Sequence, residues 1–380
     1  MSIFDVIAHG AMGTASRADQ SGVERAIAAA LASSDGGTVY FPAGRYLVTS
    51  TLRIPSERRI QVAGEGYSST LLWTCDDHLF AFDPGVRCRE VTFRDFRVEA
   101  NASIRVDRAA IYCGGGAERA HFANLLIMPG IRLPASGIWT ADITDSSTIQ
   151  NCQFWRLTGT GIRLAHGSAI YVIGGRIIGN NLVPTSIGIH LTGGQGGVQV
   201  YGTDIIGLHE GMRIEQLPGT QPNREIFLTQ VMLDGCYRGL GVYDSSYVSI
   251  AGCWASACTH EKIHLDFGSP TLVIAGGTIF NAGAGGIADP TFGAHGLVVN
   301  SGTFAMNGVL IRANVNKGIW VPNPSPSDYV ISGCKFDGNG QAIWANGQNY
   351  VCTSNVTRNG AKNTLLGQGY VYGINVNDNP

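Results

Sequence analysis

A short pattern recurs along most of this chain and constrains its fold more than any other feature. A small residue, usually glycine, precedes a hydrophobic residue, any residue and a second apolar residue, as in Gly137-Ile138-Trp139-Thr140. Further copies begin at Gly161, Gly188, Gly211, Gly239, Lys262, Gly296, Gly318, Ala342 and Gly373. Successive copies are separated by roughly 22 to 34 residues, which is typical of one turn of a solenoid. The repeat therefore predicts a stack of coils.

Each repeat also has an upstream half in which polar and apolar residues alternate. The alternation is clearest in the segments Thr148–Phe154, Val248–Trp254 and Tyr329–Phe336, and it predicts short strands. One column of this half holds asparagine or glycine, for example Asn151 and Gly252. We expect a sharp bend with positive φ there, because side chains with a Cβ otherwise resist that conformation. The repeat therefore predicts three strands in each coil.

The amino end departs from the repeat. Ser21–Glu24 fits a capping box, and Val23, Ile27 and Leu31 recur every four residues before Gly36 ends the pattern. This predicts an amphipathic helix that covers the exposed edge of the first coil and prevents edge-to-edge association. We predict a cap at residues 1–36 and one continuous domain at residues 37–380.

Composition excludes several classes of protein. Only 14% of the residues are charged and 52 are glycine, which argues against a coiled coil and a disordered chain. The net charge is -2, so no basic field attracts nucleic acid or anionic lipid. The longest apolar run, Ala26–Ala32, is far shorter than the roughly 20 residues of a membrane span, and the opening lacks a secretion signal. We expect no nucleic acid or membrane partner and a cytoplasmic location. We also expect reduced cysteines, and the repeat places Cys152, Cys253 and Cys334 at one buried position of successive coils.

By these features the chain resembles the right-handed parallel β-helix proteins of the pectate-lyase superfamily, which include polygalacturonase-like glycosidases and phage tailspike depolymerases. The most specific segments are Phe4–Ala11, Gly37–Val48 and Ile60–Gly66. Relatives often carry a GDG and paired aspartates where this chain keeps only Asp19. The resemblance implies an all-β, single-stranded right-handed parallel β-helix, an oligosaccharide or polysaccharide partner and, for a protein of phage origin, a place in the virion.

In a parallel solenoid, one position of successive coils forms a ladder with rungs about 4.8 Å apart. The outward position of the repeated strand holds cationic, imidazole and indole side chains, which suit a sugar chain. We predict that this wall binds substrate through Arg163, His190, Arg213, Arg238, Tyr243, His264, Trp320 and Trp344.

Acidic residues and a histidine precede or begin the repeated strand in the central coils. They are Glu210, Glu261 and His295, and the resemblance to polygalacturonases implies that the two glutamates are an acid and base pair with His295 nearby. Two rungs separate the glutamates by about 10 Å of backbone, which allows carboxylates at the spacing of an inverting glycosidase. Glu215 and Asp266 form an alternative pair on the same wall. We predict a glycoside hydrolase that needs no cofactor and no metal.

Two other functions stay open. A polysaccharide lyase or related transferase would use Arg213 to neutralise a uronate, with Tyr243 or a histidine abstracting the proton. A phage-tail β-helix would bind its receptor without catalysis. The string His260–His264 matches the HExxH zinc motif, but it falls on a repeated strand, where the two histidines would lie about 13 Å apart.

One further outward column is unusually apolar for a solvated face. It reads Thr148, Val172, Gln199, Phe227, Ser249, Val273, Ala305, Val330 and Val351. Burial between copies of the chain would remove this surface from water. Tailspikes that the chain resembles are usually trimers, so we expect a homotrimer.

Overall fold

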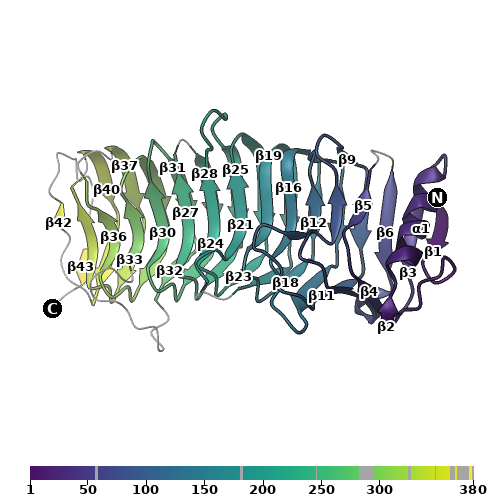
Figure 1. Ribbon diagram of the computed structural model, residues 1–380. Helices are drawn as coiled ribbons and strands as arrows, with labels where there is room; N and C mark the ends of the chain where they lie inside the picture. The colour runs from purple at the N-terminus through teal and green to yellow at the C-terminus, as the bar shows by residue number, and fades with distance from the viewer. Residues whose placement is uncertain are drawn as a thin grey trace. The chain divides into compact units, whose positions relative to one another are not determined.

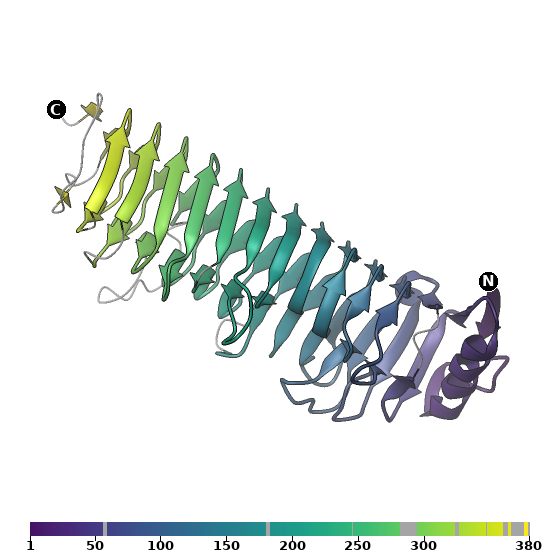
Figure 2. The same ribbon diagram turned by 90° about the horizontal axis from the view of Figure 1, so that it is seen from above.

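A computed structural model describes nearly all of the chain: residues 1–55, 59–179, 183–244, 246–281, 295–323, 327–346, 348–359, 364–365 and 376–378. The chain forms two compact units, Met1–His190 and Leu191–Pro380. Each unit is a right-handed parallel β-solenoid whose coils stack strand on strand (Figures 1 and 2). The all-β parallel β-helix predicted from the repeat is confirmed.

The first unit contains the cap. The strand β1 (Ser2–Asp5) pairs in parallel with β3 (Gly37–Phe41), and α1 (Gln20–Ala32) packs against both strands at the amino-terminal end (Figure 1). Val23, Ala26, Ile27 and Ala30 form the buried stripe of the helix, so the predicted amphipathic cap is confirmed. The other strands of the first sheet in this unit are β5 (Leu52–Ile54), β6 (Ile60–Gly64), β8 (Phe80–Phe82), β9 (Cys88–Arg89), β10 (Thr92–Arg94), β12 (Ala109–Cys113), β13 (Ala117–Glu118), β14 (His121–Ala123), β16 (Ser136–Asp145), β17 (Thr148–Gln150) and β19 (Thr160–Ile173). The strand β21 (Ile187–Thr192) begins in this unit, and its last two residues belong to the second.

A second sheet closes each coil of the first unit. Its strands are β2 (Thr14–Ala18), β4 (Gly44–Val48), β7 (Ser69–Trp73), β11 (Arg97–Ala100), β15 (Leu126–Pro129), β18 (Gln153–Trp155) and β20 (Arg176–Ile178), with one 3₁₀ turn, η1 (Gly66–Ser68). The capping box predicted at Ser21 is wrong. The helix begins at Gln20 after Asp19, and the Asp19 carboxylate accepts hydrogen bonds from Met12, Gly13 and Leu47 instead of capping the helix.

The second unit repeats three strands per coil, as predicted. Its first sheet contains β22 (Gln195–Tyr201), β24 (Glu210–Glu215), β25 (Arg224–Thr229), β27 (Arg238–Tyr243), β28 (Tyr247–Ala251), β30 (Glu261–Asp266), β31 (Thr271–Ala275), β33 (His295–Val299), β34 (Thr303–Asn307), β36 (Lys317–Val321), β37 (Ser327–Ser332), β39 (Gln341–Ala345), β40 (Gln348–Thr353) and β42 (Thr364–Leu365). Its second sheet contains β23 (Asp204–Ile206), β26 (Met232–Asp234), β29 (Trp254–Ser256), β32 (Thr278–Phe280), β35 (Leu310–Arg312), β38 (Lys335–Asp337), β41 (Val356–Arg358) and β43 (Val376–Asp378).

The bends between strands follow the asparagine and glycine column. Asn151 has a φ of 51° and Gly252 a φ of 59°, and the other members of the column are also positive. These positions confirm the predicted left-handed bend. Cys152, Cys253 and Cys334 are buried beside the bends as free thiols, as expected from their common register.

The register of the apolar outward column is confirmed from Gln199 to Val351. In the first unit one member is wrong. Tyr171, not Val172, lies opposite Thr148, and Val172 is buried in the core. Ala169 lies just before this part of β19 and has a φ of 50°. This left-handed residue interrupts the alternation of inward and outward side chains, so counting residues along the sequence assigned Val172 to the wrong face.

In the part of the chain that the structure describes, no helix has both the length and the apolar character that a membrane crossing requires. The division between cap and solenoid at residue 36 is compatible with the start of β3 at Gly37. The prediction of one continuous domain after the cap stays a prediction.

Candidate active site

Five residues begin successive strands on one wall of the second unit. We call Glu210, Arg238, Glu261, His295 and Lys317 the entrance column, because they are the first residues of β24, β27, β30, β33 and β36. The strand register places Glu210 opposite Arg238 and Glu261 opposite His295. The stacking therefore brings together residues that lie dozens of positions apart in the sequence.

A glycine makes room for the centre of this site. Gly241 occupies an outward position of β27, and a Cβ built there would overlap the carboxylate of Glu210 and the hydroxyl of Tyr243. Both side chains fold into the space above the glycine. The Tyr243 hydroxyl donates to Glu210 Oε1 at 2.7 Å and accepts a hydrogen bond from Arg238 Nη1 at 2.8 Å.

Glu210 is almost completely buried, with 3% of its surface exposed. Arg213 Nη1 lies 3.6 Å from its Oε2, and Arg238 Nη1 lies 3.9 Å from its Oε1. Burial raises the pKa of Glu210, and the hydrogen bond from Tyr243 and the two guanidinium charges only partly offset this effect. The pKa of Glu210 is therefore higher than that of an ordinary glutamate.

Glu261 lies on the other side of the same guanidinium. Arg238 Nε contacts its Oε2 at 2.9 Å, and His260 Nδ1 contacts its Oε1 at 2.6 Å. Burial by itself would raise the pKa of Glu261, but the hydrogen bond from His260 and the charge of Arg238 outweigh it and hold the pKa at about 2. Two neighbouring carboxylates thus have pKa values shifted in opposite directions.

The alternative acidic pair is less enclosed. Glu215 accepts from Arg213 Nε at 2.9 Å, and Asp266 Oδ2 lies 3.6 Å from His264 Nε2. Tyr243 is opposite Asp266 in the strand register. Glu215 and Asp266 therefore lie on the wall that holds Glu210 and Glu261, as the sequence predicts, but their side chains are more exposed to solvent.

Two predicted histidines are buried beside the glutamates. Asn300 Nδ2 contacts His264 Nε2 at 3.1 Å, and the amide donates, so the imidazole accepts at this nitrogen. The His295 ring stacks on Trp320 with 4.5 Å between centroids. Burial, and then the charge of Lys317, lower the pKa of His295 to about 4, which keeps the ring neutral at pH 7.

Other predicted contacts divide between the two units. Arg213 lies over the Tyr243 ring, and Trp344 is the register partner of Trp320, so these residues share the wall with the glutamates. Arg163 and His190 belong to the first unit. There the Arg163 guanidinium lies over Trp139, its register partner, at 4.6 Å, and His190 is largely buried in β21.

Sequence reasoning missed several members of the site. His209, Tyr237 and His260 immediately precede the entrance column. The His209 ring stacks on Tyr237 with 4.6 Å between centroids, and the His260 ring lies tilted against Tyr237 at 4.8 Å. Asn300 and Lys317 were also missed. A detectable signal was available, because an aromatic or imidazole side chain followed by a charged one recurs before the repeated strand in three successive coils.

The zinc-motif interpretation of His260–His264 fails on geometry. Glu261–Asp266 is the strand β30, so the two histidines do not share the face of a helix. Within the ranges that the structure describes, no group of three or more metal-ligating side chains is gathered in a way that could hold a metal ion.

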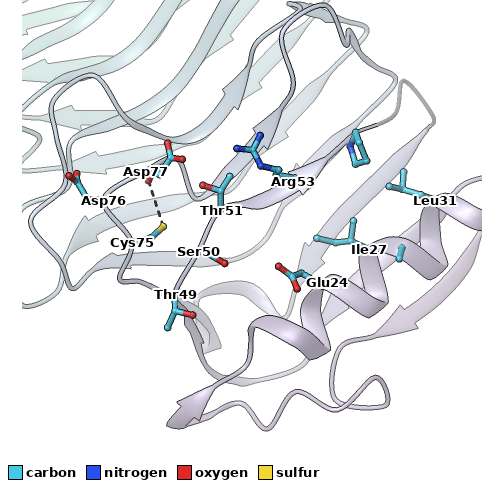
Figure 3. Close-up of a pocket in the computed structure, with 12 residues that line it drawn as sticks. Glu24, Ile27, Leu31, Thr49, Ser50, Thr51, Arg53, Cys75, Asp76 and Asp77 are labelled. Carbon is cyan, nitrogen blue, oxygen red and sulfur yellow. Dashed lines mark hydrogen bonds between the residues drawn. The ribbon is translucent and has the colours of Figure 1, made fainter.

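A separate groove lies beside the cap helix in the first unit. It has a volume of about 680 Å³ and is lined by α1 residues such as Glu24 and Ile27 and by the segments around Thr51 and Cys75 (Figure 3). Its two aspartates are engaged: Asp77 pairs with Arg108 at 3.2 Å, and Asp76 accepts from the Arg105 backbone at 2.9 Å. None of the residues predicted for the site lines this groove.

Comparison with known proteins supports this architecture. The model of the family "Rhamnogalacturonase A/epimerase, pectate lyase-like" matches residues 3–78, which include the cap and the first coils. The chain has a pectate-lyase-like parallel β-helix fold. No curated protein matches the sequence.

Solved structures with the same fold cover nearly the whole chain. The N-terminal fragment of bacteriophage phi29 gene product 12 is 14% identical with a TM-score of 0.68, over 98% of this chain and 73% of that one. The A-module of the mannuronan C-5 epimerase AlgE4 of Azotobacter vinelandii is 14% identical with a TM-score of 0.57, over 98% of both chains. The catalytic unit of a GH87 alpha-1,3-glucanase of Streptomyces thermodiastaticus is 15% identical with a TM-score of 0.55, over 99% of this chain and 69% of that one. At these identities the similarity establishes the fold alone.

Proposed function

We propose that the protein hydrolyses glycosidic bonds in a polysaccharide, with Glu210 and Glu261 as the acid and base pair. One observation carries this proposal: two buried carboxylates contact a single guanidinium, and their pKa values are shifted in opposite directions. Neighbouring titratable groups with separated pKa values are typical of acid and base assignments in enzymes. The mannuronan epimerase and the alpha-1,3-glucanase that share the fold support a polysaccharide as substrate.

In this proposal Glu210 is the general acid. Its pKa is raised, which favours the role of proton donor, and its proton passes to the glycosidic oxygen as the bond from that oxygen to the anomeric carbon breaks. Glu261 stays ionised and takes a proton from the water that attacks the anomeric carbon. The proton donated by Glu210 and the proton received by Glu261 balance, and exchange with solvent restores both groups.

The remaining predicted residues have supporting roles. His295 lies next to Glu261 and is neutral, so it suits a hydrogen bond to the sugar rather than an ion pair. Arg213, Arg238, Tyr243 and His264 hold the two glutamates or face them. Trp320 and Trp344 offer apolar faces on the same wall. Within the first unit, Arg163 and His190 are proposed as sugar contacts. Glu215 and Asp266 remain the alternative acid and base pair.

The test begins with a panel of polysaccharides and mass analysis of the products. On a substrate that is cleaved, Glu261→Gln and Glu210→Gln should each lower kcat by roughly 10²- to 10⁴-fold, the range contributed by a positioned acid or base. The matched control is Glu225→Gln, because Glu225 is exposed on β25 of the same unit. Circular dichroism should show all three variants folded. Wild-type activity in Glu261→Gln would contradict the assignment.

A second candidate, a polysaccharide lyase, is favoured by one contact. The guanidinium of Arg213 lies 5.1 Å from the Tyr243 ring centroid, which places a half-exposed cation next to a phenol. Burial raises the pKa of Tyr243, so its hydroxyl stays protonated, and in a lyase a histidine rather than Tyr243 would abstract the proton. A lyase would leave unsaturated sugar ends that absorb in the ultraviolet, and a hydrolase would leave none.

We also propose a threefold assembly of the chain. The apolar outward column of the second unit includes Phe227, Val273 and Val330, each with 40% or more of its surface exposed. Burial of these side chains against other copies would remove them from water.

A further inference from the structure

Lys317 differs from Arg213 and Arg238 in having no acidic partner among the residues that the structure describes. Arg213 contacts Glu215 and Glu210, and Arg238 contacts Glu261. Among the residues whose positions are described, no carboxylate oxygen lies within 4.0 Å of the Lys317 ammonium. The contacts recorded for this ammonium are with two indole rings.

These indoles flank the ammonium on two adjacent rungs. Lys317 Nζ lies 4.7 Å from the centroid of Trp320 and 5.8 Å from that of Trp344. Trp320 and Trp344 are register partners, and all three side chains are only partly buried. We call these three residues the Lys317 platform. It combines apolar faces for a sugar ring with a cation at their edge.

The surroundings of the platform leave its charge available. His295, which lies between Glu261 and Lys317 in the entrance column, stacks on Trp320 and is neutral at pH 7 because its pKa is about 4. An indole face attracts the ammonium but accepts no conventional hydrogen bond, so the three N–H donors of Lys317 keep their capacity for an oxygen ligand. A partly desolvated ammonium binds an anion more strongly than one in bulk water.

We propose that the Lys317 platform binds a sugar that carries an anionic group, and that Lys317 makes the protein selective for such glycans. The inference rests on the proposed function and names the class of its substrate. A carboxylate and a sulfate ester share the required chemistry. Lys317 is two rungs from Glu261, about 10 Å along the stack, so the anionic sugar is a neighbour of the cleaved bond rather than the sugar that reacts.

The test measures binding, not turnover. Glu261→Gln protein, which keeps a polymer intact, is titrated with alginate, carboxyl-reduced alginate, dextran sulfate and dextran, and tryptophan fluorescence and affinity electrophoresis report the affinity. We expect binding to at least one anionic polymer and at least tenfold weaker binding to its neutral counterpart. The alginate arm identifies a carboxylate and the dextran sulfate arm a sulfate.

Three substitutions in the same background assign the effect to the platform. Lys317→Met should weaken anionic-polymer binding by about tenfold and reduce its dependence on salt, as expected for the loss of one charge-assisted contact. Lys317→Arg keeps the charge and should retain affinity within about threefold. Lys335→Met is the control, because Lys335 is exposed on β38 of the other sheet, and it should bind as the parent does.

Three outcomes would overturn the inference: unchanged affinity in Lys317→Met, equal affinity for the anionic and neutral polymers, or no binding to any anionic polymer of the panel. The proposed hydrolysis fails separately. Wild-type protein that binds an anionic polymer through Lys317 but leaves its length unchanged supports the platform and contradicts hydrolysis of that polymer. Cleavage of a neutral polymer that depends on Glu261 supports hydrolysis and contradicts the platform.

Discussion

One lysine occupies an interior position that glycine holds in neighbouring coils. Lys262 follows Glu261 on β30, between Gly239 and Gly296 in the register, and its side chain has no exposed surface. Its Nζ has no hydrogen-bond partner among the residues that the structure describes. Burial lowers the pKa of Lys262 to about 8, and the nearby Cys258 and Glu261 only partly oppose the shift. The fold therefore tolerates a residue that is unfavourable when charged.

The lowered pKa of Lys262 predicts how the stability of the protein depends on pH. The pKa of Lys262 is about 10.5 when unfolded and about 8 when folded, so between those values the unfolded chain binds more protons and stability rises with pH. Below pH 8 the full penalty applies. We expect Lys262→Met to raise the free energy of unfolding at pH 7 by on the order of 3 kcal/mol, with the gain shrinking toward pH 10.5.

Urea unfolding of both proteins at pH 7, 8, 9 and 10 measures this effect. Lys335→Met serves as the exposed control and should change stability little at any of these pH values. A constant difference between Lys262→Met and the parent across the pH range would contradict a buried, titrating lysine.

At the scale of single elements, the cap depends on one carboxylate. Asp19 is 2% exposed, and its two oxygens accept from the backbone N–H groups of Met12 at 2.5 Å, Gly13 at 3.1 Å and Leu47 at 2.8 Å. These bonds connect the loop before α1 to β4. These contacts are all with backbone N–H groups, so the role of Asp19 is structural.

We expect Asp19→Ala to destabilise the protein by about 3 kcal/mol, because it leaves buried N–H donors without acceptors. The midpoint of urea unfolding measures the loss. Asp35→Ala removes an exposed acid shortly after α1 and should change stability by less than about 0.5 kcal/mol. Equal effects of the two substitutions would show that the Asp19 contacts contribute little.

The elements also show which local predictions succeed. Asn151 and Gly252 could be assigned to left-handed bends from sequence because few residues tolerate positive φ, and the bends lie there. The capping box could not be judged in this way. Ser21 satisfies the motif, but the start of α1 depends on how Asp19 is bound by the segment at Leu47, which is distant in sequence.

At the scale of the whole molecule, the proposed trimer makes the apolar column the interface. We expect light scattering to give three times the chain mass at micromolar concentration. Val273→Glu and Val330→Glu place charges on exposed positions of that column and should shift the mass toward the monomer, because an unpaired charge is costly in an interface. Lys335→Glu changes an exposed residue on the other sheet and should remain trimeric. A wild-type monomer would contradict the assembly.

The division between sequence and structure follows from the range of the interactions. The solenoid, its three strands per coil, its cap and the wall that carries Glu210 and Glu261 could be predicted from the sequence, because they depend on periodicity and on the backbone preferences of glycine and asparagine. Only the tertiary structure decided that Tyr243 folds over Gly241 onto Glu210, that Arg238 contacts both glutamates and that Lys317 lies against two indoles. Those outcomes depend on side-chain packing and desolvation between coils, which make the pKa of Glu210 rise and that of Glu261 fall although both are glutamates at the same position of the repeat.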